Sequence, residues 1–198
     1  MIKIGLTGNI ASGKTLSENI FKSYGIKVIS ADDIVHDLIR NDKKTIKNII
    51  NLFSQYDIFE NNNIDIISRK KIAKIVFNNK LLREKLEQIL HPQVIEKINI
   101  FFEENENEKI AIASIPLLFE ANLQKMFDII IFIQANENIR LKRLMMRNNY
   151  SESFARKIMD TQINENIKIP LSNFIVENNS DKYSLQEQID KIIKKINT

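Results

Sequence analysis

The first 30 residues alternate between apolar runs and one amphipathic stretch. Residues 2–7 form an apolar run that ends in glycine, as a buried strand does, and residues 26–29 form a second, shorter run. Between them, residues 14–24 carry apolar side chains at helical spacing, and Gly25 follows at the position of a helix C-cap. This order of strand, loop, helix and strand predicts a βαβ unit, and therefore a parallel sheet.

Residues 31–105 carry a mostly helical pattern. Apolar residues recur at i, i+3, i+4 and i+7 within residues 46–53, and Ser68 precedes another periodic stretch as a potential N-cap. A third apolar face ends at His91 and Pro92, where the missing backbone donor of proline predicts an interruption or a kink. We expect this region to be a helical insertion in the α/β core.

Apolar runs return in the second half of the chain and predict strands at residues 109–114, 128–134 and 174–176. A highly charged stretch, residues 136–164, has a helical pattern and is rich in arginine and lysine. An amphipathic helix over residues 185–196 closes the chain.

The composition excludes several kinds of chemistry. The chain has 198 residues and a mass of 23.1 kDa, which suits one domain with inserted subdomains. It has no cysteine, which excludes disulfides, thiol nucleophiles and cysteine-based zinc sites, and His36 and His91 lie far apart in sequence. No apolar run reaches the ~20 residues of a membrane span and no signal-peptide layout is present, so we expect a cytoplasmic protein without a membrane partner.

The net charge of +4 and the pI of about 9.1 allow two interpretations. A basic protein attracts anions such as nucleotides or phosphorylated metabolites. A biased composition rich in Lys, Asn and Ile is the favoured explanation of the charge, because the interspersed signs are those of an ordinary surface. Aromatic and basic residues are not interleaved, so we expect no nucleic-acid partner.

The chain has only 4 glycines, all within its first 25 residues, so a glycine-dependent ligand loop must lie there. Residues 8–15 read G-N-I-A-S-G-K-T and match the phosphate loop, or P-loop, G-x-x-x-x-G-K-[ST] between a predicted strand and a predicted helix. Backbone N–H groups of residues 11–16 can converge on phosphate oxygens. Lys14 supplies a charge for the β- and γ-phosphates, and the Thr15 hydroxyl is placed to bind Mg²⁺. The predicted nucleotide-binding residues are Gly8, Ala11, Ser12, Gly13, Lys14, Thr15 and Leu16.

The glycine count also narrows the class of P-loop protein. The D-x-x-G switch of GTPases needs a later glycine, and the guanine-reading N-K-x-D is absent too. The apolar run that ends at Ser114 and Ile115 carries no acid, unlike the strand that serves Mg²⁺ in ATPase motors. A kinase for a small molecule is therefore favoured, and a non-catalytic ATP-binding switch is the alternative.

Two acids, Asp32 and Asp33, follow the second predicted strand. Because ligands of parallel α/β sheets bind beyond the carboxyl ends of strands, either acid could accept the proton of an attacking hydroxyl or orient it. The simpler alternative is that one of them caps a helix that begins around Ile34. Spacing alone does not separate these interpretations.

Taken together, the motifs resemble the dephospho-CoA kinase family, and the resemblance covers nearly the whole chain. The P-loop alone is not specific for this family, whereas the ordered set of motifs is. The matching segments are G-L-T-G to G-K-T at 5–15, V-I-S-A-D at 28–32, L-H-P at 90–92, P-L-L-F-E at 116–120, R-L at 143–144, R-N at 147–148, Ser151, Gln162 and F-I-V-E-N at 174–178.

The resemblance implies roles for particular residues. Asp32 matches the catalytic Asp of the family, and ATP with Mg²⁺ is the implied phosphate donor. Arg143 and Arg147, four residues apart on one helix face, match a lid that neutralises the transferring phosphoryl group. The resemblance also implies that His91, Leu117 and Glu120 contact the acceptor, dephospho-CoA. It implies that Asn178 contacts the adenine of ATP.

Some positions depart from the family pattern. Asn9 and Ala11 stand where glycine is usual, and Ala11 can present its N–H to a phosphate if its φ is negative. Ser30 replaces the first Asp of D-A-D, which leaves Asp32 as the matching acid.

The resemblance implies a fold as well: an α/β, P-loop nucleotide-kinase-like parallel sheet flanked by helices. We expect residues 1–30, 109–135 and 171–198 to form the P-loop core. Residues 31–108 would then be a helical acceptor subdomain, and residues 136–170 a helical lid. Another nucleotide or small metabolite as acceptor remains the alternative, and we expect a monomer or a weak homo-oligomer.

Overall fold

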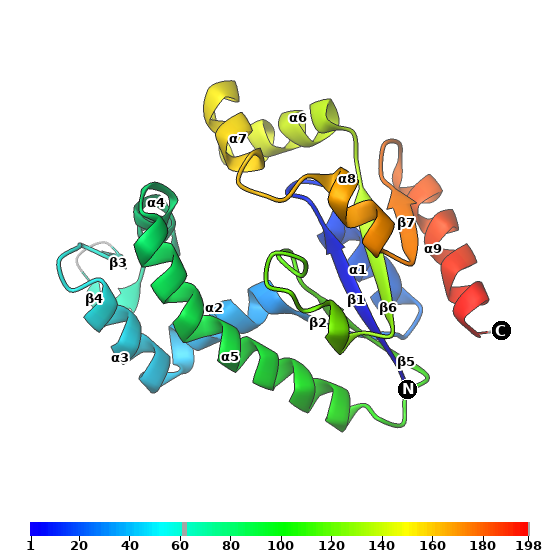
Figure 1. The fold of residues 1–198 in the computed structure, drawn as a ribbon, viewed down its shortest axis with the longest axis horizontal. Coiled ribbons are helices and arrows are strands. Elements are labelled where there is room, and N and C mark those ends of the chain that lie inside the picture. The colour runs from blue at the N-terminus through cyan, green and yellow to red at the C-terminus, as the bar shows by residue number, and fades with distance from the viewer. Residues whose placement is uncertain (61–62, 198) are drawn as a thin grey trace. The chain divides into compact units, whose positions relative to one another are not determined.

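The computed structural model describes residues 1–60 and 63–197, and a five-stranded sheet forms its core (Figure 1). The strand order is β2-β5-β1-β6-β7, and every neighbouring pair is parallel. The strands are β1 (Ile2–Gly8), β2 (Lys27–Ser30), β5 (Ile110–Ser114), β6 (Ile129–Gln134) and β7 (Phe174–Glu177). The predicted parallel α/β fold is confirmed.

The strand register brings the carboxyl ends of three strands to one edge of the sheet. Leu6 in β1 and Ser30 in β2 both pair with Ser114 in β5. β1 continues to Gly8, which pairs with Ile133 in β6. Because ligands of parallel sheets bind beyond the carboxyl ends, the loop after Gly8 lies where a ligand is expected.

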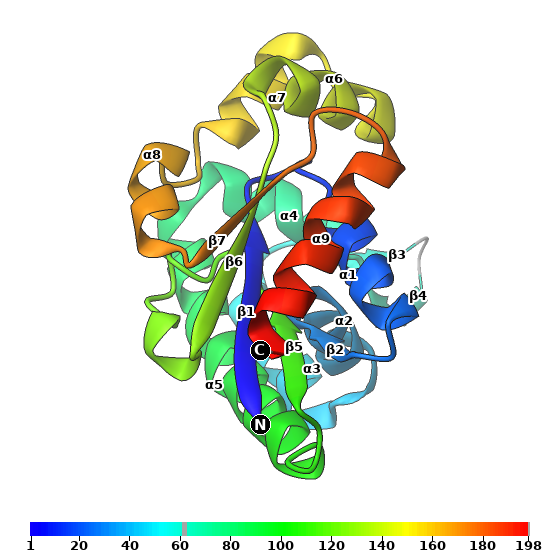
Figure 2. The ribbon, with the colours of Figure 1, turned by 90° about the vertical axis from the view of Figure 1, so that its right-hand side faces the viewer.

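Two helices cover one side of this sheet, α1 (Lys14–Ser23) and α9 (Lys182–Asn197) (Figure 2). Their apolar faces and the strands share one buried cluster, so the helix that follows the phosphate loop is anchored to the core. The cluster consists of Ile4, Leu6, Ile20, Phe21, Ile110, Ile112, Ile131, Ile133, Val176, Leu185, Ile189 and Ile192.

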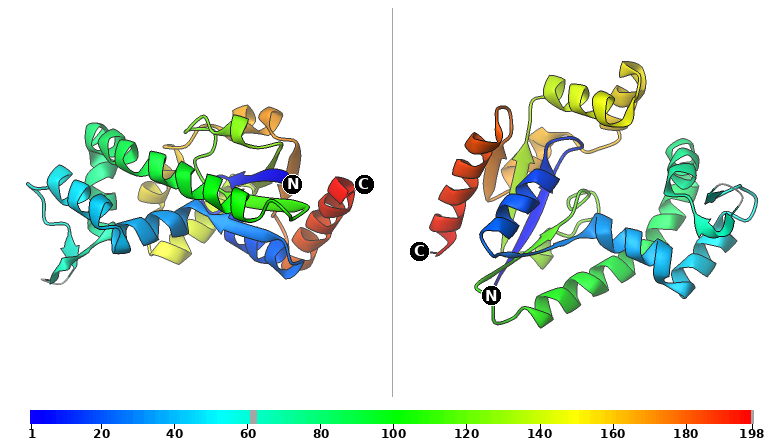
Figure 3. Two further views of the ribbon diagram at one scale, coloured as in Figure 1. Left: turned by 90° about the horizontal axis from the view of Figure 1, so that it is seen from below. Right: turned by 180° about the vertical axis from the view of Figure 1, so that it is seen from behind.

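Helices α6 (Glu137–Asn148) and α7 (Glu152–Met159) form a hairpin (Figure 3). Asn149 ends α6 in the left-handed conformation, with φ of 53°, and the Ser151 side chain caps α7 by accepting the Phe154 N–H. Three short helices lie between the larger elements: η1 (Gln124–Met126) before β6, and α8 (Glu165–Lys168) and η2 (Ile169–Leu171) before β7.

Contacts divide the described chain into two units, residues 31–101 and the remainder. The unit of residues 31–101 contains α2 (Ala31–Asn41), α3 (Lys43–Leu52), α4 (Arg69–Asn78), most of α5 (Lys80–Glu104) and the strands β3 (Phe59–Glu60) and β4 (Asn63–Ile67). Asp42 caps α3, and Thr45 Oγ1 donates a 2.7 Å hydrogen bond to Gln93 Oε1 in α5. The acceptor role of this unit stays a prediction.

The structure differs from the sequence-based expectation at two places in this unit. Helix α5 is not interrupted at His91 and Pro92, because Leu90, Val94 and Ile98 continue one buried face through the proline. The antiparallel pair β3 and β4 was not expected within a region of helical pattern. No helix of residues 1–60 and 63–197 is both long and apolar enough to cross a membrane.

Candidate active site

The phosphate loop links β1 to α1 through residues 9–13. Gly13 has a φ of 99°, which is accessible to glycine, and it stands directly before the first turn of α1. Among the described residues, no side chain caps this helix N-terminus, so its first N–H groups can bind an anion. Within the loop, the Ser12 N–H donates to Asn9 O at 3.0 Å. This N–H group, one of those expected to bind phosphate, is therefore part of a turn.

Ala11 departs from the expectation of a negative φ. Its φ is 60°, in the left-handed region, so the negative φ on which N–H donation by Ala11 to a phosphate was conditional is not found. Ala11 packs beside Ile10 against the cluster formed by Leu141, Leu144 and Ala155 in α6 and α7. This packing can offset the left-handed strain of about 1–2 kcal/mol that an L-residue carries.

Asn178, just after β7, hydrogen-bonds to the backbone of the phosphate loop. Its Nδ2 donates to Ser12 O at 2.7 Å, and its side chain is buried. A Cβ on Gly13 would lie only 1.9 Å from Nδ2, so glycine is needed there for space as well as for φ. The predicted adenine contact of Asn178 stays a prediction.

A further feature of the loop is the hydroxyl group of Ser12. Its Oγ is buried and is without a hydrogen-bond partner within residues 1–60 and 63–197. A buried hydroxyl without a partner is costly, whereas a phosphate oxygen would accept its hydrogen. The orphaned hydroxyl therefore fits a phosphate in the loop.

Lys14 lies among polar side chains at the carboxyl end of β5. Its Nζ is 3.0 Å from Oε1 of Glu18, one helical turn along α1, and donates to Oγ of Ser114 at 2.8 Å. Thr15 follows on the exposed side of the same turn. A hydroxyl oxygen at this position suits a hard cation such as Mg²⁺.

The two predicted lid arginines have different surroundings. Arg143 in α6 reaches the loop: Nη2 donates to Asn178 O at 3.1 Å, and Nη1 lies 3.5 Å from Ser12 O. Arg147 is exposed and donates to the neighbouring Asn148 side chain at 2.9 Å. The structure therefore brings Arg143, but not Arg147, to the phosphate loop.

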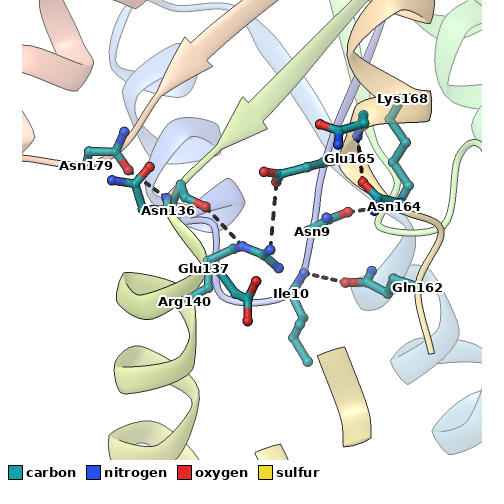
Figure 4. A network of polar contacts seen from close by, with 12 residues as sticks. Asn9, Ile10, Asn136, Glu137, Arg140, Gln162, Asn164, Glu165, Lys168 and Asn179 are labelled. Atoms are coloured by element: carbon teal, nitrogen blue, oxygen red, sulfur yellow. Dashed lines mark hydrogen bonds and ion pairs between the residues drawn. The ribbon is translucent and has the colours of Figure 1, made fainter. Parts of the chain in front are cut away.

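The segment after the α6–α7 hairpin also bonds to the phosphate loop (Figure 4). The Ile10 N–H donates to Gln162 Oε1 at 2.6 Å. Lys168, whose side chain is fully buried, donates to Asn9 Oδ1 at 2.9 Å and to Glu120 Oε1 at 2.7 Å. Two side chains of residues 162–168 thus hold the first half of the loop.

A polar cavity of about 580 Å³ lies between α6, α7 and the segment after them. Arg140 is buried at its wall, donates to Ala135 O at 3.0 Å and lies 3.7 Å from Glu165 (Figure 4). The lining residues are Asn9, Glu137, Arg140, Arg156, Met159, Asp160, Gln162, Ile163, Asn164, Glu165 and Asn166.

The predicted acceptor residues lie in different units. Asp32 and His91 belong to the unit of residues 31–101, while Leu117 and Glu120 follow β5. Helix α2 begins at Ala31, so Asp32 and Asp33 lie in its first turn and the idea that one of them caps a helix near Ile34 is wrong. Acidic side chains in the first turn are stabilised by the helix dipole, and the acceptor role of Asp32 stays a prediction.

Glu18, Ser114 and Lys168 contribute to the site without having been predicted from the sequence. Glu18 stands four residues after Lys14, and this spacing on a helix was an available signal for an ion pair. No local pattern indicates that Lys168 bonds to Asn9, because 159 positions separate them in the sequence.

A parallel sheet with a central phosphate-loop strand and an arginine-bearing helical hairpin at the loop define a P-loop kinase. The model of the dephospho-CoA kinase family matches residues 2–184 of this chain. The chain belongs to the dephospho-CoA kinase family.

Relatives and solved structures agree with this membership. Dephospho-CoA kinase of Rickettsia conorii is 34% identical over 194 residues, covering 98% of this chain and 97% of the relative. The structure of dephospho-CoA kinase from Campylobacter jejuni has a TM-score of 0.70 at 30% identity, covering 98% of this chain and 96% of its own. A Thermus thermophilus protein of known structure shares the fold, with a TM-score of 0.82 at 24% identity over 100% of this chain and 98% of its own.

Proposed function

We propose that this chain transfers the γ-phosphoryl group of ATP to the ribose 3′-hydroxyl of dephospho-CoA and so forms coenzyme A, the last step of its biosynthesis. The observation that carries the proposal is the convergence of Lys14, Ser12 and Arg143 at a phosphate loop in a chain of this family. In the reaction the bond from the γ-phosphorus to the ADP oxygen breaks, a bond to the 3′-oxygen forms, and the hydroxyl proton leaves.

The donor side of the site is built on β1 and α1. N–H groups at the start of α1 and the Ser12 hydroxyl bind phosphate oxygens, and Lys14 adds its charge. The Thr15 hydroxyl would hold Mg²⁺, and a bound Mg²⁺ would neutralise part of the phosphate charge. Arg143 stabilises the charge that spreads over the transferring group.

On the acceptor side, Asp32 orients the 3′-hydroxyl or takes its proton. A carboxylate is a suitable base when the attacking oxygen loses its proton late, because phosphoryl transfer has a loose transition state. His91, Leu117 and Glu120 contact dephospho-CoA in this proposal. Glu120 retains one buried oxygen, Oε2, that has no hydrogen-bond partner among the described residues, while Oε1 holds Lys168.

The direct test is a transfer assay with purified protein, ATP, Mg²⁺ and dephospho-CoA, with coenzyme A measured by chromatography. We expect coenzyme A to form in step with ADP. A panel of nucleosides, nucleotides and phosphorylated metabolites serves as the control for acceptor choice. A folded, ATP-binding protein that forms no coenzyme A would refute the proposal, and ADP release with another acceptor would identify the alternative kinase.

Asp32→Asn tests the acceptor role of this carboxylate. The variant keeps the size and polarity of the side chain but cannot accept a proton, so we expect kcat to fall by about 10²–10⁴-fold. ATP affinity, measured by titration calorimetry, should change little. The neighbouring Asp33→Asn variant is the matched control, and full activity of Asp32→Asn would contradict the role.

A further inference from the structure

An acid does lie at the end of β5, although the strand itself carries none. Glu18 reaches this position from α1, and its Oε1 accepts a hydrogen bond from Oγ of Ser114, the last residue of the strand. The side chain of Glu18 is 6% exposed. A buried carboxylate of this kind persists when it is paired and hydrogen-bonded, and both conditions hold here.

The acid acts on the lysine of the phosphate loop. Lys14 Nζ lies 3.0 Å from Glu18 Oε1 and 2.8 Å from Ser114 Oγ, and its side chain is only 11% exposed. Since Glu18 and Ser114 also bond to each other, the three side chains form a closed triangle. A lysine held by two fixed partners has little rotamer freedom left, so its ammonium group is kept in one place.

The same carboxylate opposes the charge of an incoming nucleotide. Lys14 attracts the β- and γ-phosphates, and a negative charge in contact with Lys14 weakens that attraction. A unit charge about 4 Å away changes an equilibrium by roughly fivefold even at the dielectric constant of water. The penalty grows with the charge of the ligand, so it is larger for metal-free ATP than for ATP bound to Mg²⁺.

We propose that Glu18, supported by Ser114, is a positioning residue for Lys14 that fixes its ammonium group and makes the site discriminate against metal-free ATP. The role in turnover rests on the proposed kinase function, whereas the role in ATP discrimination requires only that the loop bind ATP. The two parts therefore have separate tests.

The variant Glu18→Gln removes the charge and keeps the size and the hydrogen bond to Ser114. We expect calorimetry to show metal-free ATP, in the presence of EDTA, bound roughly five- to tenfold more tightly, and ATP with Mg²⁺ changed about threefold or less. We also expect kcat to fall about tenfold because Lys14 is less firmly placed.

Two further variants separate charge from position. Ser114→Ala leaves the charge of Glu18 in place, so we expect a lower kcat with an unchanged preference for ATP bound to Mg²⁺. Glu18→Asp keeps the charge on a shorter side chain, and we expect it to retain most of the preference. If Glu18→Gln fails to fold, which a circular dichroism melt detects, Glu18→Asp takes its place as the test variant.

Unchanged or weaker binding of metal-free ATP by folded Glu18→Gln would overturn the discrimination role. Unchanged kcat would overturn the positioning role. If the protein transfers phosphate to no acceptor, the binding titrations still decide the first question. The failure of this inference is thus distinguishable from the failure of the proposed function.

Discussion

At the scale of single residues, backbone space is what most tightly constrains the phosphate loop. Gly13 combines a positive φ with a neighbour, Asn178, that occupies the place of a Cβ. Gly25 also has a positive φ, 77°, but nothing lies within 4 Å of its Cβ position. Substitutions at the two glycines therefore separate the free-energy cost of an unfavourable φ from that of a steric clash.

We expect Gly25→Ala to lower the free energy of unfolding by about 1 kcal/mol, through φ strain alone, and to leave ATP binding intact. For a chain of this size that corresponds to a fall of about 3 °C in Tm. Gly13→Ala has the same strain and also displaces Asn178 from Ser12, so we expect ATP affinity to fall by more than about tenfold. Calorimetric titration and thermal melts of both variants check this, and equal ATP affinities would contradict it.

Single residues also differ in whether the sequence predicts their role in the phosphate loop. The motif identifies Gly8, Gly13, Lys14 and Thr15 because their chemistry is tied to fixed spacing. The left-handed backbone of Ala11 depends on packing by α6 and α7, which no local pattern encodes. Long-range partners such as Lys168 and Asn9 are likewise brought together only by the fold.

At the scale of elements, strand and helix positions followed from periodicity wherever one side of an element faces the core. The five sheet strands, α1 and α9 were all indicated by their apolar patterns. The hairpin of β3 and β4 was not predicted because β3 has only 2 residues, which is too short to show an alternation of apolar and polar side chains. The continuity of α5 through Pro92 was missed because burial on both sides of the proline outweighs the lost hydrogen bond.

Helix α6 presents its two arginines differently, which predicts different kinetic effects. Arg143→Ala removes contacts to Ser12 and Asn178 at the phosphate loop, so we expect weaker ATP binding together with a fall in kcat/KM of about 100-fold. Arg147 is exposed and bonded to its neighbour, so we expect Arg147→Ala to lower kcat without changing the Kd for ATP.

The measurements are steady-state rates and ATP titrations of the two variants, with Lys142→Ala, an exposed residue of the same helix, as the control. A loss of ATP affinity in Arg147→Ala equal to that in Arg143→Ala would show that the arrangement of α6 does not distinguish the two arginines.

At the scale of the whole molecule, the carboxyl groups with a clearly lowered pKa are concentrated in the unit of residues 31–101. The Asn41 side chain lowers the pKa of Asp37, the side chain and backbone of Thr45 lower that of Asp42, and the Lys71 ammonium lowers that of Asp57, each chiefly through hydrogen bonds to the charged form. A carboxyl whose pKa is lowered by folding stabilises the fold above its ordinary pKa, and this contribution is lost as the pH falls through the folded value.

Asp42→Asn isolates this effect, because asparagine caps a helix about as well as aspartate but cannot ionise. We expect the wild-type chain to have the higher urea midpoint at about pH 7. The difference should be smaller at about pH 3, below the ordinary carboxyl pKa, and should vanish only below the lowered pKa of folded Asp42. A difference of the same size at both pH values would contradict the assignment of the stabilisation to the charge.

The α6–α7 hairpin is fastened to the phosphate loop at two places. Arg143 holds it near Ser12, and Gln162, just beyond α7, holds it at Ile10. A body pinned at two points keeps a single rotational degree of freedom, the swing about the line through both pins. If both bonds persist while the hairpin moves, the hairpin can turn about the line through Ser12 and Ile10 but cannot slide along the phosphate loop.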